Sequence, residues 1–152
     1  EREVIEQIAQ IQARSAAQQR WRLTTSRRTP PGFVAALNKV VDPARIEIVP
    51  FERTDAEWLP AQLAWAGTVW VSADSVSMIY EALTAGAAVG LIEVAAQGED
   101  RIASGIQSLV DTGLATSFSQ WRSGAELRAP KQPFSEASRV AREIMQRWFN
   151  GV

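Results

Sequence analysis

The chain has 152 residues, 46% of them hydrophobic, which fits one globular domain with a substantial core. Its formal net charge is −1 with lysines and arginines dispersed along the sequence, so there is no extended basic surface and nucleic acid is not expected as a partner. Cysteine and histidine are both absent, which excludes disulfides, Cys–His and Ser–His–Asp catalytic groups and the usual zinc sites.

The sequence contains no apolar stretch long enough to span a bilayer and no charged-then-apolar leader at its amino end. We therefore expect a cytoplasmic protein, with peripheral contact at a membrane surface as the alternative. The chain begins with Glu1 rather than Met. We accordingly expect a piece of a longer protein, for which an absent leader says little.

The first segment predicts a helix over Glu3 to Gln18, with apolar residues at helical spacing among Gln, Ala and Arg. Its apolar stripe is thin. We therefore expect residues 1–20 to form a linking helix that packs against a part outside this chain, and residues 21–152 to form the domain proper. Trp21 to Thr25 predicts the first strand.

A strand-to-helix turn follows over Ser26 to Gly32 and carries two adjacent arginines, Arg27 and Arg28. Thr29 as N-cap and Pro30 as the first helical residue would suit the start of the next helix. Guanidinium groups bind phosphate bidentately, and such charge-assisted bonds contribute about 1.5–3 kcal/mol each where water is excluded. The turn is a candidate phosphate site, with a pair of plain surface arginines as the alternative.

The next strand is expected over Ile46 to Val49, followed by a connecting loop over Phe51 to Thr54. From Asp55 to Ala66 the pattern predicts a helix, which tolerates Pro60 because this proline lies near the first turn.

The central stretch, residues 68–94, predicts two buried strands joined by a helix. Thr68 to Val71 and, apart from Glu93, Ala88 to Val94 are short apolar runs, as expected for strands covered on both faces. Between them, apolar positions recur at helical spacing after Ser72-Ala73-Asp74-Ser75, and Gly86 ends the helix. These lengths predict a right-handed βαβ unit with parallel strands.

In such a unit the strand end and the helix N-terminus meet at one turn, where unpaired backbone N–H groups and the helix dipole attract anions. Ser72, Ser75 and Ser77 are small donors suited to a phosphate. Asp74, however, brings negative charge, whose repulsion could outweigh the about 0.3–1 kcal/mol that a helix dipole offers an anion. Either Asp74 turns inward to cap the helix, or a cation compensates it, for which the paired arginines are candidates.

On this helix, Asp74, Ser77, Glu81 and Thr84 share the face opposite the apolar stripe. Glu81 projects on the side of the turn, and a carboxylate there can accept two hydrogen bonds from a vicinal diol such as a ribose. The alternative is a solvated Glu81 with an N-capping Asp74.

After the central unit we expect a helix over residues 102–110 closed by Gly113, a short edge strand at Ala115 to Phe118 and an irregular segment over Trp121 to Phe134. A final helix capped by Ser135 carries an apolar stripe of Val140, Ala141, Ile144 and Trp148. The alternation predicts an α/β fold, a Rossmann-like three-layer sandwich with about five parallel strands. Among six tryptophans, Trp65, Trp70 and Trp148 fall at core-facing positions and are interpreted as core filling.

The chain resembles the mitochondrial-fission ELM (elongated mitochondria) family over most of Trp21 to Phe118. The residues that carry the resemblance are LTTSRRTP at 23–30, LAWA at 63–66, SADSVSM at 72–78, Glu81-Ala82 and Gly86. Bacterial members are often labelled nucleoside-diphosphate-sugar epimerases, and the family looks like GT-B glycosyltransferases, with two facing Rossmann-like domains. The resemblance implies that this chain is the carboxy-terminal half and that the missing amino-terminal domain is its partner.

By that resemblance, Ser26, Arg27 and Arg28 would meet the diphosphate of a nucleotide sugar, Ser75 and Ser77 would add donors, and Glu81 would take the ribose hydroxyls. The candidate substrate-binding set is completed by Thr29, Ser72 and Asp74. Relatives commonly have Gly-Lys-Pro-Val where this chain has Gly-Ala-Ala-Val at 86–89, so one lysine contact is missing.

The implied activity is that of a glycosyltransferase whose donor substrate is a nucleoside diphosphate-sugar, with no separate cofactor. The sequence contains no Asp-x-Asp metal motif, which favours binding without a metal. The alternatives are a nucleotide-sugar epimerase and a non-catalytic interaction protein at membranes. No catalytic residue is assigned, because the base that activates the acceptor is expected in the missing half.

Overall fold

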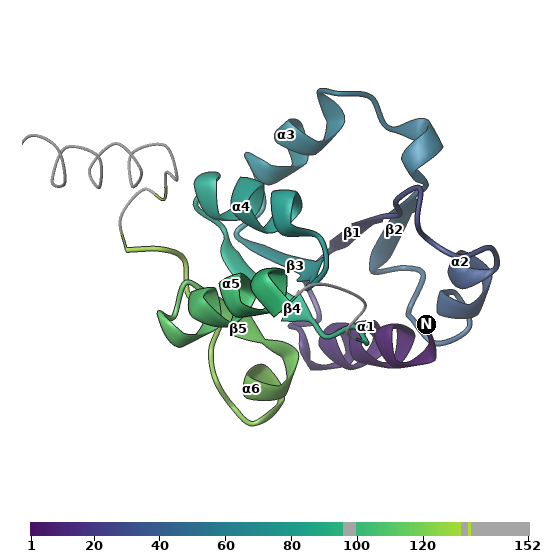
Figure 1. Cartoon of the computed structure of the whole chain (residues 1–152). Coiled ribbons are helices and arrows are strands. Elements are labelled where there is room, and N and C mark those ends of the chain that lie inside the picture. Colours follow the sequence, from purple (N-terminus) through teal and green to yellow (C-terminus); the bar gives the residue numbers. More distant parts are fainter. Residues whose placement is uncertain (96–99, 132–133, 135–152) are drawn as a thin grey trace, which may run out of the picture.

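The computed structural model describes residues 1–95, 100–131 and 134, and helices and strands alternate along them (Figure 1). The helices are α1 (Arg2–Arg14), α2 (Phe33–Leu37), α3 (Trp58–Leu63), α4 (Val76–Thr84), α5 (Asp100–Asp111) and α6 (Phe118–Arg122), with a 3-10 helix, η1 (Phe51–Arg53). The strands are β1 (Trp21–Thr24), β2 (Ile46–Val49), β3 (Thr68–Ser72), β4 (Ala88–Ile92) and β5 (Ala115–Ser117). The helix expected after Ser135, with Trp148, lies outside the described residues.

The five strands of the described residues are all parallel and form two hydrogen-bonded sheets. One pairs β1 with β2, placing Trp21 opposite Ile46, and the other has the order β3-β4-β5. The predictions of an α/β fold with parallel strands and of a βαβ unit are confirmed, as is β5 as an edge strand. The difference is that no backbone ladder joins β1 to β3 in the described part of the chain.

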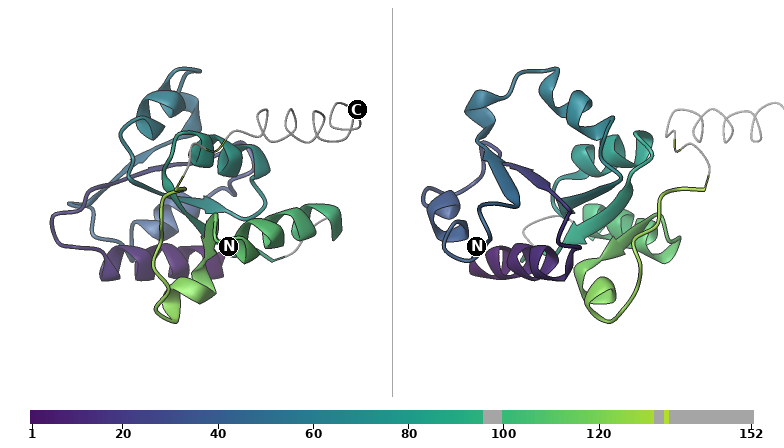
Figure 2. Two further views of the ribbon diagram at one scale, coloured as in Figure 1. Left: turned by 90° about the vertical axis from the view of Figure 1, so that its left-hand side faces the viewer. Right: turned by 180° about the vertical axis from the view of Figure 1, so that it is seen from behind.

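One hydrophobic cluster lies on the side of the three-stranded sheet that carries α4 and α5. Val71, Val89 and Leu91 contribute to it from the strands, and Ile79 and Leu83 of α4 are fully buried in it. These helical positions belong to the predicted apolar stripe. Helix α3 packs on the same cluster, and Figures 1 and 2 show α3 and α4 together on one side of the strands.

The second cluster lies on the opposite side and is covered by α1, α2 and α6. Ile5, Ile8 and Ile11 of α1 are buried in it, next to Leu37 of α2 and Phe118 of α6. The apolar stripe of α1 is therefore buried within this chain. Its thin pattern had instead suggested packing against a part outside the chain. Figures 1 and 2 show α1 running along this side of the strands.

The tryptophans divide between core and surface. Trp70 packs edge-on against Trp121, with ring centroids 5.3 Å apart, and lies beside the second cluster, so its prediction is confirmed. Trp65 is 91% exposed, so its prediction as a core residue is wrong. The physical reason is that Trp65 comes two residues after the buried Leu63 of α3, and residues two apart lie on nearly opposite sides of a helical turn.

No helix in the described ranges has both the length and the apolar character needed to cross a bilayer.

Candidate functional site

The turn between β1 and α2 is shaped by its own hydroxyl groups. Thr29 Oγ1 accepts a hydrogen bond from the backbone N–H of Ser26 at 2.9 Å, and Ser26 Oγ accepts one from the N–H of Arg28 at 3.2 Å. Thr25 Oγ1 accepts from the N–H of Phe51 at 3.0 Å, which ties the turn to the chain just after β2. Two of the predicted phosphate-binding hydroxyl oxygens therefore already hold the turn in place.

Helix α2 begins later than predicted. Its N-cap is Gly32, at a φ of 87°, and its first helical residue is Phe33. Thr29 is not the cap, because its hydroxyl oxygen is directed back to Ser26. Pro30 is not helical either, because it is itself followed by a proline, which disfavours the helical conformation of the preceding residue. The correction lengthens the turn that carries the arginines.

The turn between β3 and α4 is held by the backbone. The N–H of Ala73 donates to the carbonyl of Ile92 at 2.9 Å, and the N–H of Ser75 donates to the carbonyl of Ser72 at 2.9 Å. Ser75 is the N-cap of α4 but makes no side-chain capping bond. The first N–H groups of this nine-residue helix are thus left without a side-chain acceptor, and they can stabilise an anion.

The two turns meet through an ion pair. Nη1 of Arg28 lies 3.1 Å from Oδ2 of Asp74, and the two side chains are 66% and 44% exposed. Of the two roles expected for Asp74, compensation by a cation is therefore the one observed, and inward capping is not. An exposed pair of this kind contributes at most about 1 kcal/mol to stability, so it adds little to what holds the fold together.

The remaining candidate residues lie on exposed surface around this pair. Arg27 is exposed and forms no ion pair or hydrogen bond with any described residue. Ser77 and Glu81 are exposed on α4, on the same face as Asp74 and opposite the buried Ile79, as predicted. Glu81 also has no partner in the described ranges. Arg27, Arg28 and Asp74 together leave one net positive charge at the turns.

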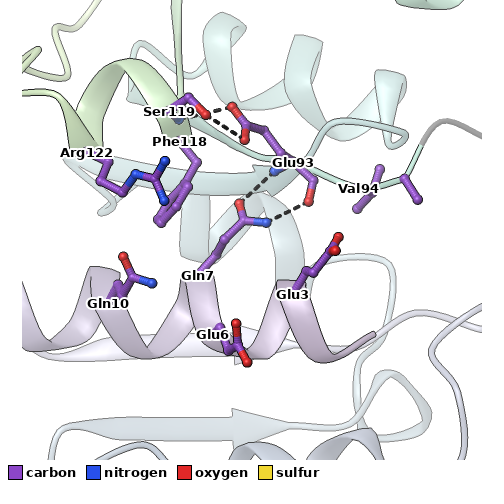
Figure 3. Close-up of a pocket in the computed structure, with 10 residues that line it drawn as sticks. Glu3, Glu6, Gln7, Gln10, Glu93, Val94, Phe118, Ser119 and Arg122 are labelled. Atoms are coloured by element: carbon purple, nitrogen blue, oxygen red, sulfur yellow. Dashed lines mark hydrogen bonds between the residues drawn. The ribbon is translucent and has the colours of Figure 1, made fainter.

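Two of the pockets formed by the described residues lie elsewhere, and none of the predicted site residues lines either of them. One, of about 340 Å³, opens beside the start of β1 and β3 and is lined by Trp21, Trp70 and Trp121 among others. The other, of about 290 Å³, lies between α1 and the ends of β4 and β5 (Figure 3). Most of the candidate residues, among them Arg27, Arg28, Asp74 and Glu81, are exposed, so the candidate site is an open surface.

The pocket of Figure 3 is built around a contact that the sequence reasoning missed. The side-chain amide of Gln7 donates to the carbonyl of Glu93 at 2.7 Å and accepts from its N–H at 2.8 Å. The Glu93 carboxylate accepts from the N–H and the hydroxyl of Ser119, at 3.0 and 2.8 Å. Glu93 is thus fully engaged in structure. The only signal in the sequence was one acidic residue in an otherwise apolar strand.

A second glutamine of α1 repeats this arrangement. Gln12 donates to the carbonyl of Asp42 at 3.0 Å and accepts from its N–H at 2.7 Å. Gln7 and Gln12 are both buried, at 7% and 6% exposure. Each pairs with both the N–H and the carbonyl of one backbone residue, so α1 is fastened to the domain by polar as well as apolar contacts.

Comparison with known proteins gives one match. The sequence model of the family described as mitochondrial fission ELM1 matches residues 1–148. No curated protein and no solved structure matches the chain. The family match includes α1 as well as both turns of the candidate site.

Proposed function

This chain belongs to the mitochondrial fission ELM1 family, and from that premise we propose that it is the nucleotide-sugar-binding part of a GT-B-like glycosyltransferase. The donor substrate is a nucleoside diphosphate-sugar, and no separate cofactor is required. The observation that carries the proposal is the contact between Arg28 and Asp74, because it brings the arginine turn against the N-terminus of α4.

In this proposal the diphosphate lies between the two turns. Arg27 and Arg28 donate to its oxygens from one side, and the free N–H groups at the start of α4 donate from the other. As the bond between sugar and diphosphate breaks, these donors stabilise the negative charge that develops on the leaving group. The site therefore stabilises the leaving group through positive groups that the fold has already placed before the substrate binds.

The rest of the donor is bound by residues of α4 and its turn. The hydroxyl groups of Ser75 and Ser77 reach phosphate or sugar oxygens, and the unpaired Glu81 carboxylate accepts two hydrogen bonds from the ribose diol. The acceptor is activated by a base from the other half of the protein. This chain contains no histidine, so that base is not an imidazole supplied here.

The open shape of the site agrees with this role. The arginine turn and the first turn of α4 form a surface with their donors exposed, as one wall of a cleft does when the facing wall is absent. A facing domain would exclude water and strengthen each charge-assisted bond. An epimerase would use the same donor site and would differ in the chemistry of the facing wall.

One observation favours a second candidate, a non-catalytic interaction protein. Trp65 is 91% exposed, and a large exposed aromatic residue is an anchor of the kind that protein interfaces use. This candidate predicts that the turns bind no nucleotide and that a partner covers Trp65.

The two candidates are separated by calorimetric titration of the 152-residue chain with UDP, GDP, ADP and CMP. We expect saturable binding of one nucleotide, weakened about 10- to 100-fold by Arg28→Ala, as loss of a charge-assisted bond implies. Glu81→Ala should weaken it as well. The matched control is Arg22→Ala, which removes an exposed, paired arginine of β1 away from the turn and should leave the affinity unchanged.

Binding that persists in both Arg28→Ala and Glu81→Ala would move the nucleotide site elsewhere. Binding of no nucleotide at all would favour the interaction protein.

A further inference from the structure

We propose that Asp74 is a built-in competitor for the phosphate-binding arginine: it holds Arg28 in the free protein and releases it when a diphosphate binds. The inference rests on the proposed function, because it concerns how the same site is occupied. It assigns to Asp74 a role in setting affinity, where the sequence pattern had suggested either inward capping or compensation by a cation.

The first argument is the place of Asp74. It lies directly before Ser75, the N-cap of α4, yet it does not cap the helix. Its carboxylate instead contacts the guanidinium of Arg28. A carboxylate and a phosphate offer the same kind of acceptor to a guanidinium, and a phosphate at this helix N-terminus would face the same arginine. Asp74 therefore occupies a position that a ligand phosphate would use.

The second argument is the form of the contact. A carboxylate that orients an arginine for binding is expected to be buried behind it and to hold it through two bonds. Here Nη1 of Arg28 lies 3.1 Å from Oδ2 of Asp74, and the carboxylate side chain is 44% exposed rather than buried behind the arginine. Solvent screens such a pair, so its rupture changes an equilibrium constant by at most about fivefold. The pair is weak enough for a ligand to replace.

The third argument is charge. With Asp74 ionised, the two arginines of the turn leave one net positive charge for a ligand that carries several negative charges. Replacing the carboxylate by an amide removes both the competitor and a repulsive charge. Losing the competitor and losing the repulsion both strengthen anion binding. If Asp74 is a competitor, neutralising it should therefore make anion binding tighter. A residue that positions Arg28 predicts weaker binding.

The test is calorimetric titration of the full chain with inorganic pyrophosphate, which probes the diphosphate subsite without regard to the nucleotide base. We expect Asp74→Asn to bind pyrophosphate about three- to tenfold more tightly than the unchanged chain, by loss of both effects. The matched control is Glu47→Gln, which makes the same charge change in the exposed Arg22–Glu47 pair and should alter the affinity less than twofold. In an Arg28→Ala background, the gain from Asp74→Asn should shrink, because only the repulsion remains.

Equal or weaker binding by Asp74→Asn, with binding by the unchanged chain still lost in Arg28→Ala, would overturn this inference and leave the proposed function standing. An equal gain in the Glu47→Gln control would also overturn it, since the effect would then be one of overall charge. If neither the unchanged chain nor Asp74→Asn binds pyrophosphate, the diphosphate site itself is refuted, and the proposed function falls with it.

Discussion

The carboxyl ends of the strands differ sharply between the β4–β5 side and the β1–β3 side of the protein. After β4, the backbone of Glu93 is clamped by the buried Gln7, and its carboxylate accepts two hydrogen bonds from Ser119. After β1, Arg27 has no partner among the described residues and Arg28 has a single exposed one. Polar residues at one edge of the strands therefore serve two purposes. Those with satisfied partners hold the fold, and those without are available to a ligand.

The closed side depends on close packing of an aromatic ring against the sheet. Gly90 of β4 has no side chain because the indole of Trp70 fills that space, and a Cβ atom built there would lie 2.5 Å from two ring carbons. Trp70 has little room to retreat, since Phe118 and Trp121 pack against it. We expect Gly90→Ala to lower the free energy of unfolding by about 3 kcal/mol, as overpacking of a dense core does. Urea unfolding of the two proteins measures the difference in the free energy of unfolding.

The control for that experiment is Gly105→Ala in α5, where a Cβ atom meets nothing within 4 Å. This change should stabilise the protein by up to about 1 kcal/mol, because alanine is the better helix former. Replacing the indole by a smaller side chain should make room for the added Cβ atom. The double variant Gly90→Ala, Trp70→Leu should therefore lose less free energy of unfolding than the two single variants lose together. Additive losses would show that the ring is not what excludes a side chain at Gly90.

The glutamine clamp is the next test of the closed side. Gln7→Ala leaves the N–H and the carbonyl of Glu93 without their partner, and we expect a loss of about 1–3 kcal/mol in the free energy of unfolding. Gln10→Ala is the matched control, because Gln10 is exposed on the same helix and should change stability by less than about 0.5 kcal/mol. If the two variants unfold alike, the clamp seen in Figure 3 does not stabilise the protein.

Local patterns predicted the parts of this fold that local physics determines. The central βαβ unit follows from two apolar runs and one helical stripe, and Gly86 and Gly113 occupy the positive φ values, 83° and 71°, expected after a helix end. The start of α2 was missed because two consecutive prolines delay the helix, although both prolines are visible in the sequence. Pro30 precedes Pro31 and is therefore kept out of the helical conformation.

Contacts between distant residues were beyond such patterns. Gln7 and Glu93 are 86 positions apart in the sequence. Nothing in the composition of α1 indicates that a glutamine side chain pairs with the backbone just after β4, as a neighbouring strand would. The meeting of the two turns was easier to expect, because parallel strands bring their carboxyl ends to one edge. Which cation would compensate Asp74 depended on tertiary structure, and the structure assigns Arg28 rather than Arg27.

The smallest expected effect on stability belongs to the open side. Arg28→Ala removes an exposed ion pair with Asp74 and should change the free energy of unfolding by less than about 1 kcal/mol, because solvent screens the pair. The same variant should nevertheless lose most of its affinity for pyrophosphate. Urea unfolding and calorimetry on one preparation measure both quantities. A loss of stability as large as that of Gln7→Ala would mean that the arginine turn holds the fold, and the two sides of the protein would then no longer differ in purpose.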